Sequence, residues 1–558
     1  MAEKNAATEQ DGERSAEGAA FDMPATSGHS SASGRPSVPE HPSAQNPDPG
    51  RIYISEVQRH QARYRKLIQF TSSSTKAAGA MLLAAIAALV VANSPVADAF
   101  AHFWHTDVGF VFGQTQATMP LSHVINDVLM AVFFLLVGLE IKYEMTVGEL
   151  TNIRQAILPI IAAVGGVLVP VAIYSAFNVG SPDTAGGWGV PTATDIAFAL
   201  GILALLGNRV PNGVRVFLST LAVADDIIAI IVIAVFYGQA PSLPWLGCAA
   251  VVFCALLLMN KRHVFSLYAY LLVGAVLWYC VFMSGVHSTI AGVLLAFAIP
   301  SGSRVNVKSF IRWSGERVVE AKSAFNAQEP VIGQEDYLKT VSSLARVSKQ
   351  VVPPATRLEH LLYPWVYFAI LPLFALTNAN VGLAGSDLGA LFSNPALLGA
   401  FFGLVVGKPL GIMAASFLVV KLKAASLPEN VTWMHMLGAA VLGGVGFTMA
   451  IFVANLAYVD EATIAAAKLG ILLASLVAGV AGFSLLAVQA KSAQKQGVAF
   501  MSLGPSEMQR QTAGEEANAA SEKLLREIDD PEVIREVEQA LAGCEGIAEV
   551  AVSLKEKR

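Results

Sequence analysis

Charged side chains are scarce in this sequence of 558 residues. Only 14% of the residues are Asp, Glu, Lys or Arg, whereas an average soluble domain contains about 25%. Hydrophobic residues make up 54% of the chain, and the mean hydropathy is +0.54. This composition excludes an ordinary soluble globular protein and indicates a membrane protein with several spans. The net charge of −5, without a basic stripe, excludes a nucleic-acid partner.

Other common signals are also missing. The four cysteines, Cys248, Cys254, Cys280 and Cys544, form neither a disulfide framework nor a CxxC metal motif. No GxxxxGK[ST] phosphate loop occurs, so we expect neither ATP as the energy source nor any cofactor. Residues 1–65 lack the apolar run of a signal peptide and are rich in Ala, Ser, Glu, Pro and Gly. They are interpreted as a disordered cytoplasmic extension.

Long hydrophobic runs recur from Ala77 to Val488. A helix needs about 20 apolar residues to cross a hydrocarbon core of about 30 Å. We therefore predict an all-α polytopic membrane protein with twelve transmembrane helices. Their expected extents are 76–93, 121–141, 155–177, 192–207, 214–237, 245–260, 264–283, 287–300, 361–379, 390–420, 434–457 and 464–489. The fourth and eighth are short for a full crossing.

The distribution of Lys and Arg predicts the orientation, because basic residues near helix ends stay on the cytoplasmic side. One alternate set of loops carries Lys142, Arg154, Arg209, Arg215, Lys261, Arg262, nine basic residues from Arg304 to Arg357, Lys421, Lys423, Lys491 and Lys495. The opposite set, 94–120, 178–190, 238–247, 283–287, 380–389 and 458–463, carries none. This pattern places both termini in the cytoplasm, around a membrane domain of residues 66–490.

Two further segments are predicted to lie in the cytoplasm. Residues 302–356 form a long loop in which Leu338, Val341, Leu344, Val347 and Val351 recur at helical spacing, which predicts an amphipathic helix. The tail, residues 491–558, is expected to be partly helical because Asp530-Pro531-Glu532 is typical of a helix start.

Asp225 and Asp226 are adjacent carboxylates in the middle of an apolar run. An ionised carboxylate at the centre of a membrane helix raises the free energy of insertion by roughly 2.5 to 3.5 kcal/mol even on lenient scales. A pair of them in one helix therefore indicates a functional role. Two close carboxylates repel each other and release their protons in a coupled way. Their oxygens also suit a hard cation. The pair therefore predicts a site for protons or a metal cation.

Two of the predicted spans contain interruptions. The segment that includes Pro191, Thr194 and Asp195 follows Gly186, Gly187 and Gly189, and a second glycine-rich segment runs from Gly443 to Met449. Interrupted helices expose carbonyl oxygens at membrane depth, which suits a cation site. The interruptions fall in the middle of helices three to five and of helices ten to twelve, so these units are expected to be two inverted repeats.

Lys408 lies in the apolar segment Gly403–Ile412. An ammonium group there either loses its proton or pairs with a carboxylate, and Asp225 or Asp226 is the expected partner. Adjacent helix residues point about 100° apart, so one aspartate can face Lys408 while the other faces an aqueous funnel. Competition between protons and a cation for these oxygens, in a site open to one side at a time, yields ion exchange.

Seven short segments together resemble the NhaA-type sodium/proton antiporters of bacterial inner membranes. They are Asn126–Glu140, Ala193–Gly201, Ala224–Asp226, Ser284–His287, Arg357–His360, Gly407–Gly411 and Gly446–Met449, in the family's order over roughly residues 66–490. The resemblance implies Asp225 and Asp226 as ion and proton carriers, Thr194 and Asp195 where the broken helices cross, and Lys408 as the partner of Asp225.

The resemblance also implies features beyond the central site. A cytoplasmic pH-responsive region would include Glu140, Glu144, Arg357 and Glu359, with a contribution from His287. Exchange of sodium or lithium for protons would be electrogenic, and a homodimer in the lipid bilayer would be joined partly by an external β-hairpin from Trp104 to Gln116. Tyr143 and Tyr363 depart from the family, because basic or His residues are expected there.

Several alternatives remain open at this point. The carboxylates and Lys408 could be purely structural, Asp195 could merely cap a half-helix, and the Glu140 cluster could be an ordinary ion-pair network. Among functions, an intramembrane aspartyl protease also places two carboxylates in membrane helices, but adjacent acids on one helix beside Lys408 fit that chemistry poorly. A cation channel would conduct without obligatory proton exchange.

Overall fold

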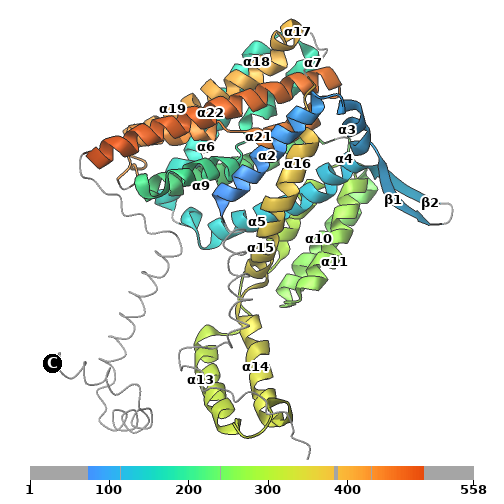
Figure 1. Cartoon of the computed structure of the whole chain (residues 1–558), viewed down its shortest axis with the longest axis vertical. Helices are drawn as coiled ribbons and strands as arrows, with labels where there is room; N and C mark the ends of the chain where they lie inside the picture. The colour runs from blue at the N-terminus through green and yellow to red at the C-terminus, as the bar shows by residue number, and fades with distance from the viewer. Residues whose placement is uncertain are drawn as a thin grey trace, which may run out of the picture. The chain divides into compact units, whose positions relative to one another are not determined.

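Helices make up almost all of the described structure (Figure 1). The computed structural model describes residues 73–112, 115–151, 153–238, 240–382, 388–428 and 430–495. Within these ranges, eight helices are long and apolar enough to cross a membrane, and up to ten spans result if each of two bent helix pairs is one span. The predicted extension 1–65 and the predicted tail helix near Pro531 lie outside the described residues.

The eight long spans agree with the hydrophobic runs of the sequence. They are α2 (Ser74–Ala92), α4 to α5 (Leu121–Thr146), α6 (Ile153–Phe177), α9 (Asn212–Phe236), α10 (Leu243–Lys261), α15 to α16 (Pro354–Asn378), α18 to α19 (Pro395–Lys421) and α22 (Glu461–Lys495). Two shorter apolar helices, α11 (Leu267–Met283) and α12 (Thr289–Ala298), also occupy predicted runs. Since these two are short, the count of twelve crossings stays a prediction.

Both predicted interruptions are present. The first bent pair consists of Pro182–Thr192 (α7 and the 3-10 turn η3) and α8 (Ile196–Leu205), inclined by 45°. The second consists of α20 (Trp433–Gly443) and α21 (Phe447–Ala457), inclined by 44°. The two breaks touch, because the backbone N–H of Asp195 donates to the carbonyl of Val445 at 2.8 Å. Backbone groups freed by one break are thus satisfied by the other.

A small hairpin is the only β-structure in the described part of the chain. Strands β1 (Asp107–Phe112) and β2 (Thr115–Pro120) pair antiparallel, with Asp107 opposite Pro120 and Phe112 opposite Thr115. The hairpin projects from the helices beside α3 (Ala97–Trp104) in Figure 1. It confirms the predicted β-hairpin, although the strands extend to Pro120 rather than ending near Gln116.

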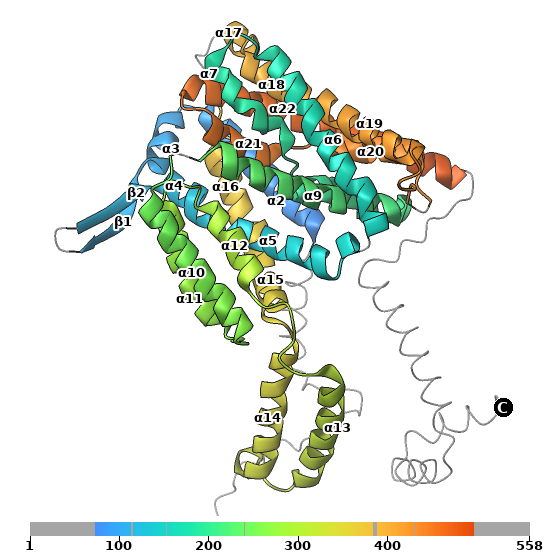
Figure 2. The same ribbon diagram turned by 180° about the vertical axis from the view of Figure 1, so that it is seen from behind.

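The long predicted loop, residues 302–356, contains a hairpin of two helices. Helix α14 (Glu335–Val351) covers the amphipathic helix that the sequence predicts. Its partner α13 (Val307–Ala324) was not predicted from the sequence. It begins at Asn306, whose side chain accepts hydrogen bonds from the backbone N–H groups of Lys308 and Ser309. The two helices run side by side in Figures 1 and 2.

Glycines let the helix that carries Lys408 approach α6 closely. A Cβ atom added to Gly411 of α19 would lie 2.1 Å from the carbonyl oxygen of Gly165 in α6, and one added to Gly165 would lie 2.4 Å from the carbonyl oxygen of Gly411. The two backbones are therefore in direct contact, as in other membrane helix pairs packed through small residues. The same approach brings Lys408 next to α6, because a Cβ atom added to Gly166 would lie 3.9 Å from the Lys408 Cε atom.

Replacement of Gly411 by alanine is expected to destabilise the protein. The added methyl group forces α6 and α19 apart, and overpacking of this kind costs about 1–3 kcal/mol. The midpoint of thermal unfolding of the detergent-solubilised protein should fall by several degrees. Gly247→Ala in α10 is the matched control, because a Cβ there meets nothing within 4 Å. An equal midpoint for the two variants would show that the close contact is absent.

Candidate functional site

The predicted ion site lies where the two broken spans meet α9 and α19. Asp225 and Asp226 sit in the middle of α9 and are 1% and 2% exposed, and Lys408, at the start of α19, is fully buried. Helix α9 is regular through this region, whereas α19 follows a π-helical turn, Gly403–Gly407. Three charged groups are thus enclosed within a small volume of protein.

Lys408 pairs with Asp225. The Lys408 Nζ atom lies 2.5 Å from Asp225 Oδ2, and it also donates a hydrogen bond to the carbonyl of Thr192 in the first break. The Thr194 hydroxyl lies 2.6 Å from the same Asp225 oxygen and 2.9 Å from the carbonyl oxygen of Gly443 in the second span. The first broken span therefore supplies groups to both members of the ion pair, and the second broken span contacts the pair only through Thr194.

Asp226 makes no ion pair with Lys408 within the described residues, and it lines a gap of about 10 Å³. This gap is lined by Thr194, Asp195, Asp226, Glu140, Tyr367 and Thr448 together with apolar residues. Within the described residues, Asp226 Oδ1 and Asp225 Oδ1 are both buried without a hydrogen-bond partner. A buried oxygen in that condition is costly unless something else satisfies it, and a cation or a proton can do so.

Asp195 caps both half-helices. Its Oδ1 accepts from the backbone N–H of Phe198 at 3.0 Å, which is an N-cap of α8. Its Oδ2 accepts from the backbone N–H of Thr448 at 3.1 Å, in the first turn of α21, and from the Thr448 hydroxyl. A carboxylate at two helix N-termini is stabilised by their partial positive charge. Asp195 therefore does cap half-helices, which was the alternative role considered for it from the sequence. These hydrogen bonds leave its carboxylate with fewer free lone pairs than that of Asp226.

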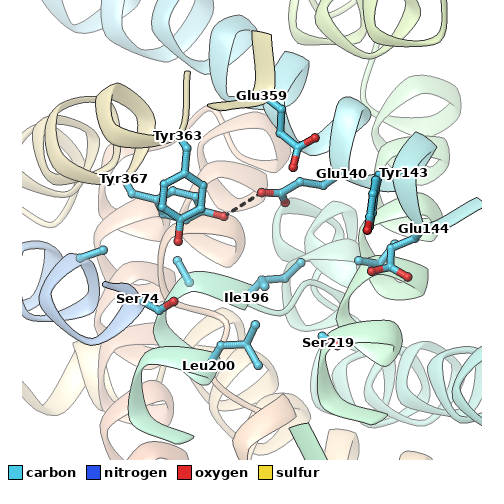
Figure 3. Close-up of a pocket in the computed structure, with 13 residues that line it drawn as sticks. Ser74, Glu140, Tyr143, Glu144, Ile196, Leu200, Ser219, Glu359, Tyr363 and Tyr367 are labelled. Carbon is cyan, nitrogen blue, oxygen red and sulfur yellow. Dashed lines mark hydrogen bonds between the residues drawn. The ribbon is translucent and has the colours of Figure 1, made fainter. Parts of the chain in front are cut away.

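A cavity of about 280 Å³ lies next to the gap (Figure 3). Its wall holds the acidic residues Glu140, Glu144 and Glu359 and the polar residues Ser74, Ser219, Tyr143, Tyr363 and Tyr367. The Tyr367 hydroxyl donates to Glu140 at 3.4 Å, and Glu359 points toward Glu140. Glu140 and Tyr367 line both the cavity and the gap, so acidic groups continue from the cavity to Asp226.

Two of the predicted pH-response residues lie elsewhere. Arg357 is not part of the cavity wall, and its Nη1 donates to the carbonyl of Lys349 at the end of α14 at 3.2 Å. The Nε2 atom of His287 lies 2.5 Å from the carbonyl oxygen of Tyr237, at the opposite end of α9 from Ser219. The structure therefore brings Glu140, Glu144 and Glu359 together but not the other two.

A cluster of tyrosines that the sequence reasoning missed holds the first broken span. The Tyr237 hydroxyl accepts from the N–H of Gly189 at 2.8 Å and donates to the carbonyl of Gly186 at 2.9 Å. The Tyr174 hydroxyl donates to the carbonyl of Thr184 at 2.7 Å and contacts the hydroxyl of Tyr458. The glycine run was the available signal, because it permits close approach of these rings as well as a helix break.

Comparisons with known proteins agree with this geometry. The sequence model of the family described as Na+/H+ antiporter 1 matches residues 68–486. The Na(+)/H(+) antiporter NhaA of Wolinella succinogenes is 41% identical over 433 residues, which is 77% of this chain and 94% of that protein. The proteins of the same name from Janthinobacterium sp. (strain Marseille) and Oleidesulfovibrio alaskensis are 44% and 45% identical over 416 and 429 residues, covering 74% and 76% of this chain and 91% and 94% of theirs.

A bundle of apolar helices with buried charges at two crossed breaks is a multi-pass membrane transporter and not an enzyme. The chain belongs to the Na+/H+ antiporter 1 family, whose curated members resemble it over most of its length. Its activity is accordingly sodium/proton exchange, as the resemblance of the seven short segments predicted.

Proposed function

We propose that this antiporter exchanges cytoplasmic sodium or lithium for external protons at Asp225 and Asp226, by competition and alternating access. The observation that carries the proposal is the buried pair of Lys408 and Asp225, beside an Asp226 oxygen that has no partner among the described residues. Charged groups that are buried at such cost in an antiporter are best explained by transport.

Charge balance gives the competition its physical basis. With Lys408 protonated and both aspartates ionised, the site carries one net negative charge. One sodium ion or one proton neutralises it, whereas both together would leave a net positive charge in a poorly solvated place. The two ligands therefore exclude each other, and each crosses the membrane only after the other has left.

The same side chains offer a set of oxygens for sodium. Hard cations prefer oxygen ligands; that rule is stated for calcium and magnesium, and we extend it to sodium. The Asp225 and Asp226 carboxylates and the Thr194 hydroxyl are the nearest candidates, and the carbonyls of Thr192 and Gly443 lie beside them. A sodium ion on Asp225 would weaken its attraction for Lys408, so loss of the Lys408 proton can accompany sodium entry.

Thr194 has one hydroxyl proton and two acceptors. An ionised Asp225 receives this proton in a hydrogen bond, whereas a protonated Asp225 can donate to Thr194, which then donates to the carbonyl of Gly443. Protonation of the aspartate thus moves the donated hydrogen bond of the Thr194 hydroxyl from Asp225 on α9 to Gly443 in the second broken span. This rearrangement supports a coupling between proton binding and the relative position of the two spans.

The cavity indicates which side of the site is accessible. Glu140 lies two residues before Lys142, and Glu359 follows Arg357, so the cavity is on the side of the basic loops that the positive-inside rule assigns to the cytoplasm. At the other end of α9, the Tyr237 hydroxyl is hydrogen-bonded to the backbone of Gly186 and Gly189 in the first broken span. We infer an inward-facing arrangement, with both termini cytoplasmic in a bacterial inner membrane.

Further features of the proposal rest on the family and on the positions of the helices. Twelve crossings with two inverted three-helix units fit the two bent pairs and the two short helices. We also propose electrogenic exchange, with more protons entering than sodium ions leaving, because each sodium ion would displace the proton of Lys408 as well as the proton of the aspartate pair. A potential-sensitive dye would detect this unequal exchange. The β1–β2 hairpin is the proposed contact of a homodimer, and chemical cross-linking of hairpin cysteines would test it.

We propose that the acidic cavity makes transport dependent on cytoplasmic pH. Glu140, Glu144 and Glu359 line the entrance, and the residues of its wall that the structure describes include no Lys, Arg or His. As the cytoplasm becomes more alkaline, these carboxylates lose protons and attract sodium toward Asp226. Arg357 and His287 would act on this response only indirectly, since neither is in the wall.

Substitution of Asp226 by asparagine should abolish exchange. In everted vesicles that hold a proton gradient, sodium or lithium should dissipate the gradient with the native chain and leave it intact with Asp226→Asn, because the amide cannot hold either ion by charge. Asp98→Asn, an exposed aspartate of α3, is the control and should behave like the native chain. A full response of the Asp226 variant would reject the assigned carrier. Sodium uptake by the native chain that leaves the proton gradient intact would indicate a channel.

Substitution of Glu359 by glutamine should move the activity profile to more alkaline pH. Glutamine mimics a carboxyl group that stays protonated, so the remaining acids must lose more protons to attract the same amount of sodium. The measurement is the vesicle assay scanned over pH, with Glu329→Gln on the exposed α13–α14 connection as control. An unchanged or more acidic profile in Glu359→Gln would contradict a role of the cavity in the pH response.

A further inference from the structure

The α13–α14 hairpin has no part in the proposed exchange. It is joined to α12 by residues 299–306 and to α15 by Val352 and Pro353. Both connections are short, so the hairpin begins within a few residues of two membrane helices. The chain connections therefore hold the adjoining ends of α13 and α14 close to the ends of α12 and α15.

One face of α13 is used inside the hairpin. Phe310, Trp313 and Ala321 are half-buried on this face. Arg317 lies there too, with its guanidinium over the Trp313 ring at 5.8 Å and in an ion pair with Glu320. These residues recur at spacings of three and four, as expected for the side of a helix that packs on its partner.

A second face of α13 is apolar and exposed. Val307, Ile311 and Val318 follow one another at intervals of four and seven residues, so they lie on one line along the helix. Their exposed fractions are 52%, 66% and 55%. Single exposed apolar residues are common on proteins. An aligned row of them on a helix outside the membrane core, however, indicates a surface that binds a partner or a membrane.

Basic residues flank this apolar row. Lys322 lies one turn after Val318, at the edge of the row, whereas Lys308 and Arg312 directly follow Val307 and Ile311 and therefore point about 100° away from them, on the same side of the row as Lys322. All three are exposed, and none of them makes an ion pair within the described residues. The acids of the helix, Glu316 and Glu320, are on the other side of the helix from the row.

Helix α14 shows a different pattern. Its exposed Lys339 is already paired with Glu335 at 3.0 Å, and this hydrogen bond raises the pKa of Lys339. Asp336 lies beside the same ammonium group at 3.8 Å. Arg346 and Lys349 of α14 are also exposed and outside the ion pairs of the described residues, but the apolar residues Leu338 and Val341 of α14 are only 39% and 37% exposed, so the more exposed apolar row is that of α13.

We propose that α13 lies along the cytoplasmic surface of the bilayer, with Val307, Ile311 and Val318 at the headgroup boundary and Lys308, Arg312 and Lys322 against anionic lipids. An apolar stripe edged by basic residues is the pattern of helices that lie in a membrane interface. Anionic lipids of the cytoplasmic leaflet attract basic segments near the surface. The inference rests on the proposed orientation, with the 302–356 segment in the cytoplasm.

The test uses the full chain with its four cysteines replaced by serine and one cysteine introduced at Val318. The cysteine carries an environment-sensitive fluorophore, and the protein is reconstituted into vesicles of phosphatidylcholine with or without phosphatidylglycerol. We expect a blue-shifted emission, quenched by spin-labelled lipids, in the vesicles that contain phosphatidylglycerol. The effect should be lost at high salt, because screening weakens the attraction.

Matched variants separate the charges of α13 from general charge effects. The triple substitution K308Q/R312Q/K322Q should abolish the quenching, whereas K339Q/R346Q/K349Q on α14 should retain it. A fluorophore at Ser342, on the exposed side of α14, should not be quenched in either vesicle. A fluorophore at Val307 should be quenched like that at Val318, since the helix lies flat.

Several results would overturn the proposal. Equal quenching without phosphatidylglycerol, or quenching at Val307 alone, would mean that α13 does not lie on an anionic surface. A blue shift that persists in detergent and disappears when the chain is truncated after Lys495 would assign the surface to the tail, and one that depends on protein concentration would assign it to a second copy. Antiport measured in the same vesicles keeps the two proposals apart, because loss of quenching with intact exchange refutes only this one.

Discussion

The structure depends on the burial of one ammonium and two carboxylate groups in a place that water hardly reaches. Desolvation of each ion costs several kcal/mol, and mutual attraction offsets this cost only if the geometry is good and the remaining lone pairs are satisfied. Asp225 meets these conditions at Oδ2, through Lys408 and Thr194, but its Oδ1 has no partner among the described residues. Oδ1 of Asp226 also has none, which is why we propose this pair of carboxylates as the place where a proton or a cation binds.

The broken spans supply backbone and side-chain polar groups around these charges. A continuous helix would bind its own carbonyls, but the breaks offer Thr192 and Gly443 carbonyls to Lys408 and Thr194. Asp195 then holds the two half-helices together by capping both. The interruptions at which we propose the cation site are also where we expect a hinge, because few backbone hydrogen bonds cross them.

The central site could be read from the sequence because charge at membrane depth is rare and costly. Asp225, Asp226 and Lys408 stand out for that reason. The Pro and Gly residues near Asp195 predict the first helix break. Tyr237 could not be found in this way, since a tyrosine at the end of an apolar run is common and its acceptor is far away in sequence. His287 and Arg357 were grouped with Glu140 by resemblance alone, and sequence does not say at which end of a helix bundle a side chain lies. Helix α13 was missed because its apolar face is narrow and half of it packs on α14.

Sodium binding and proton release should be one event. The direct measurement adds sodium to the purified protein in weak buffer and follows the pH with an indicator dye, while calorimetry reports the sodium bound. The account predicts that protons appear with each sodium ion bound and that Asp226→Asn releases none. Sodium that binds to the native protein without the release of protons would contradict the competition on which the account rests.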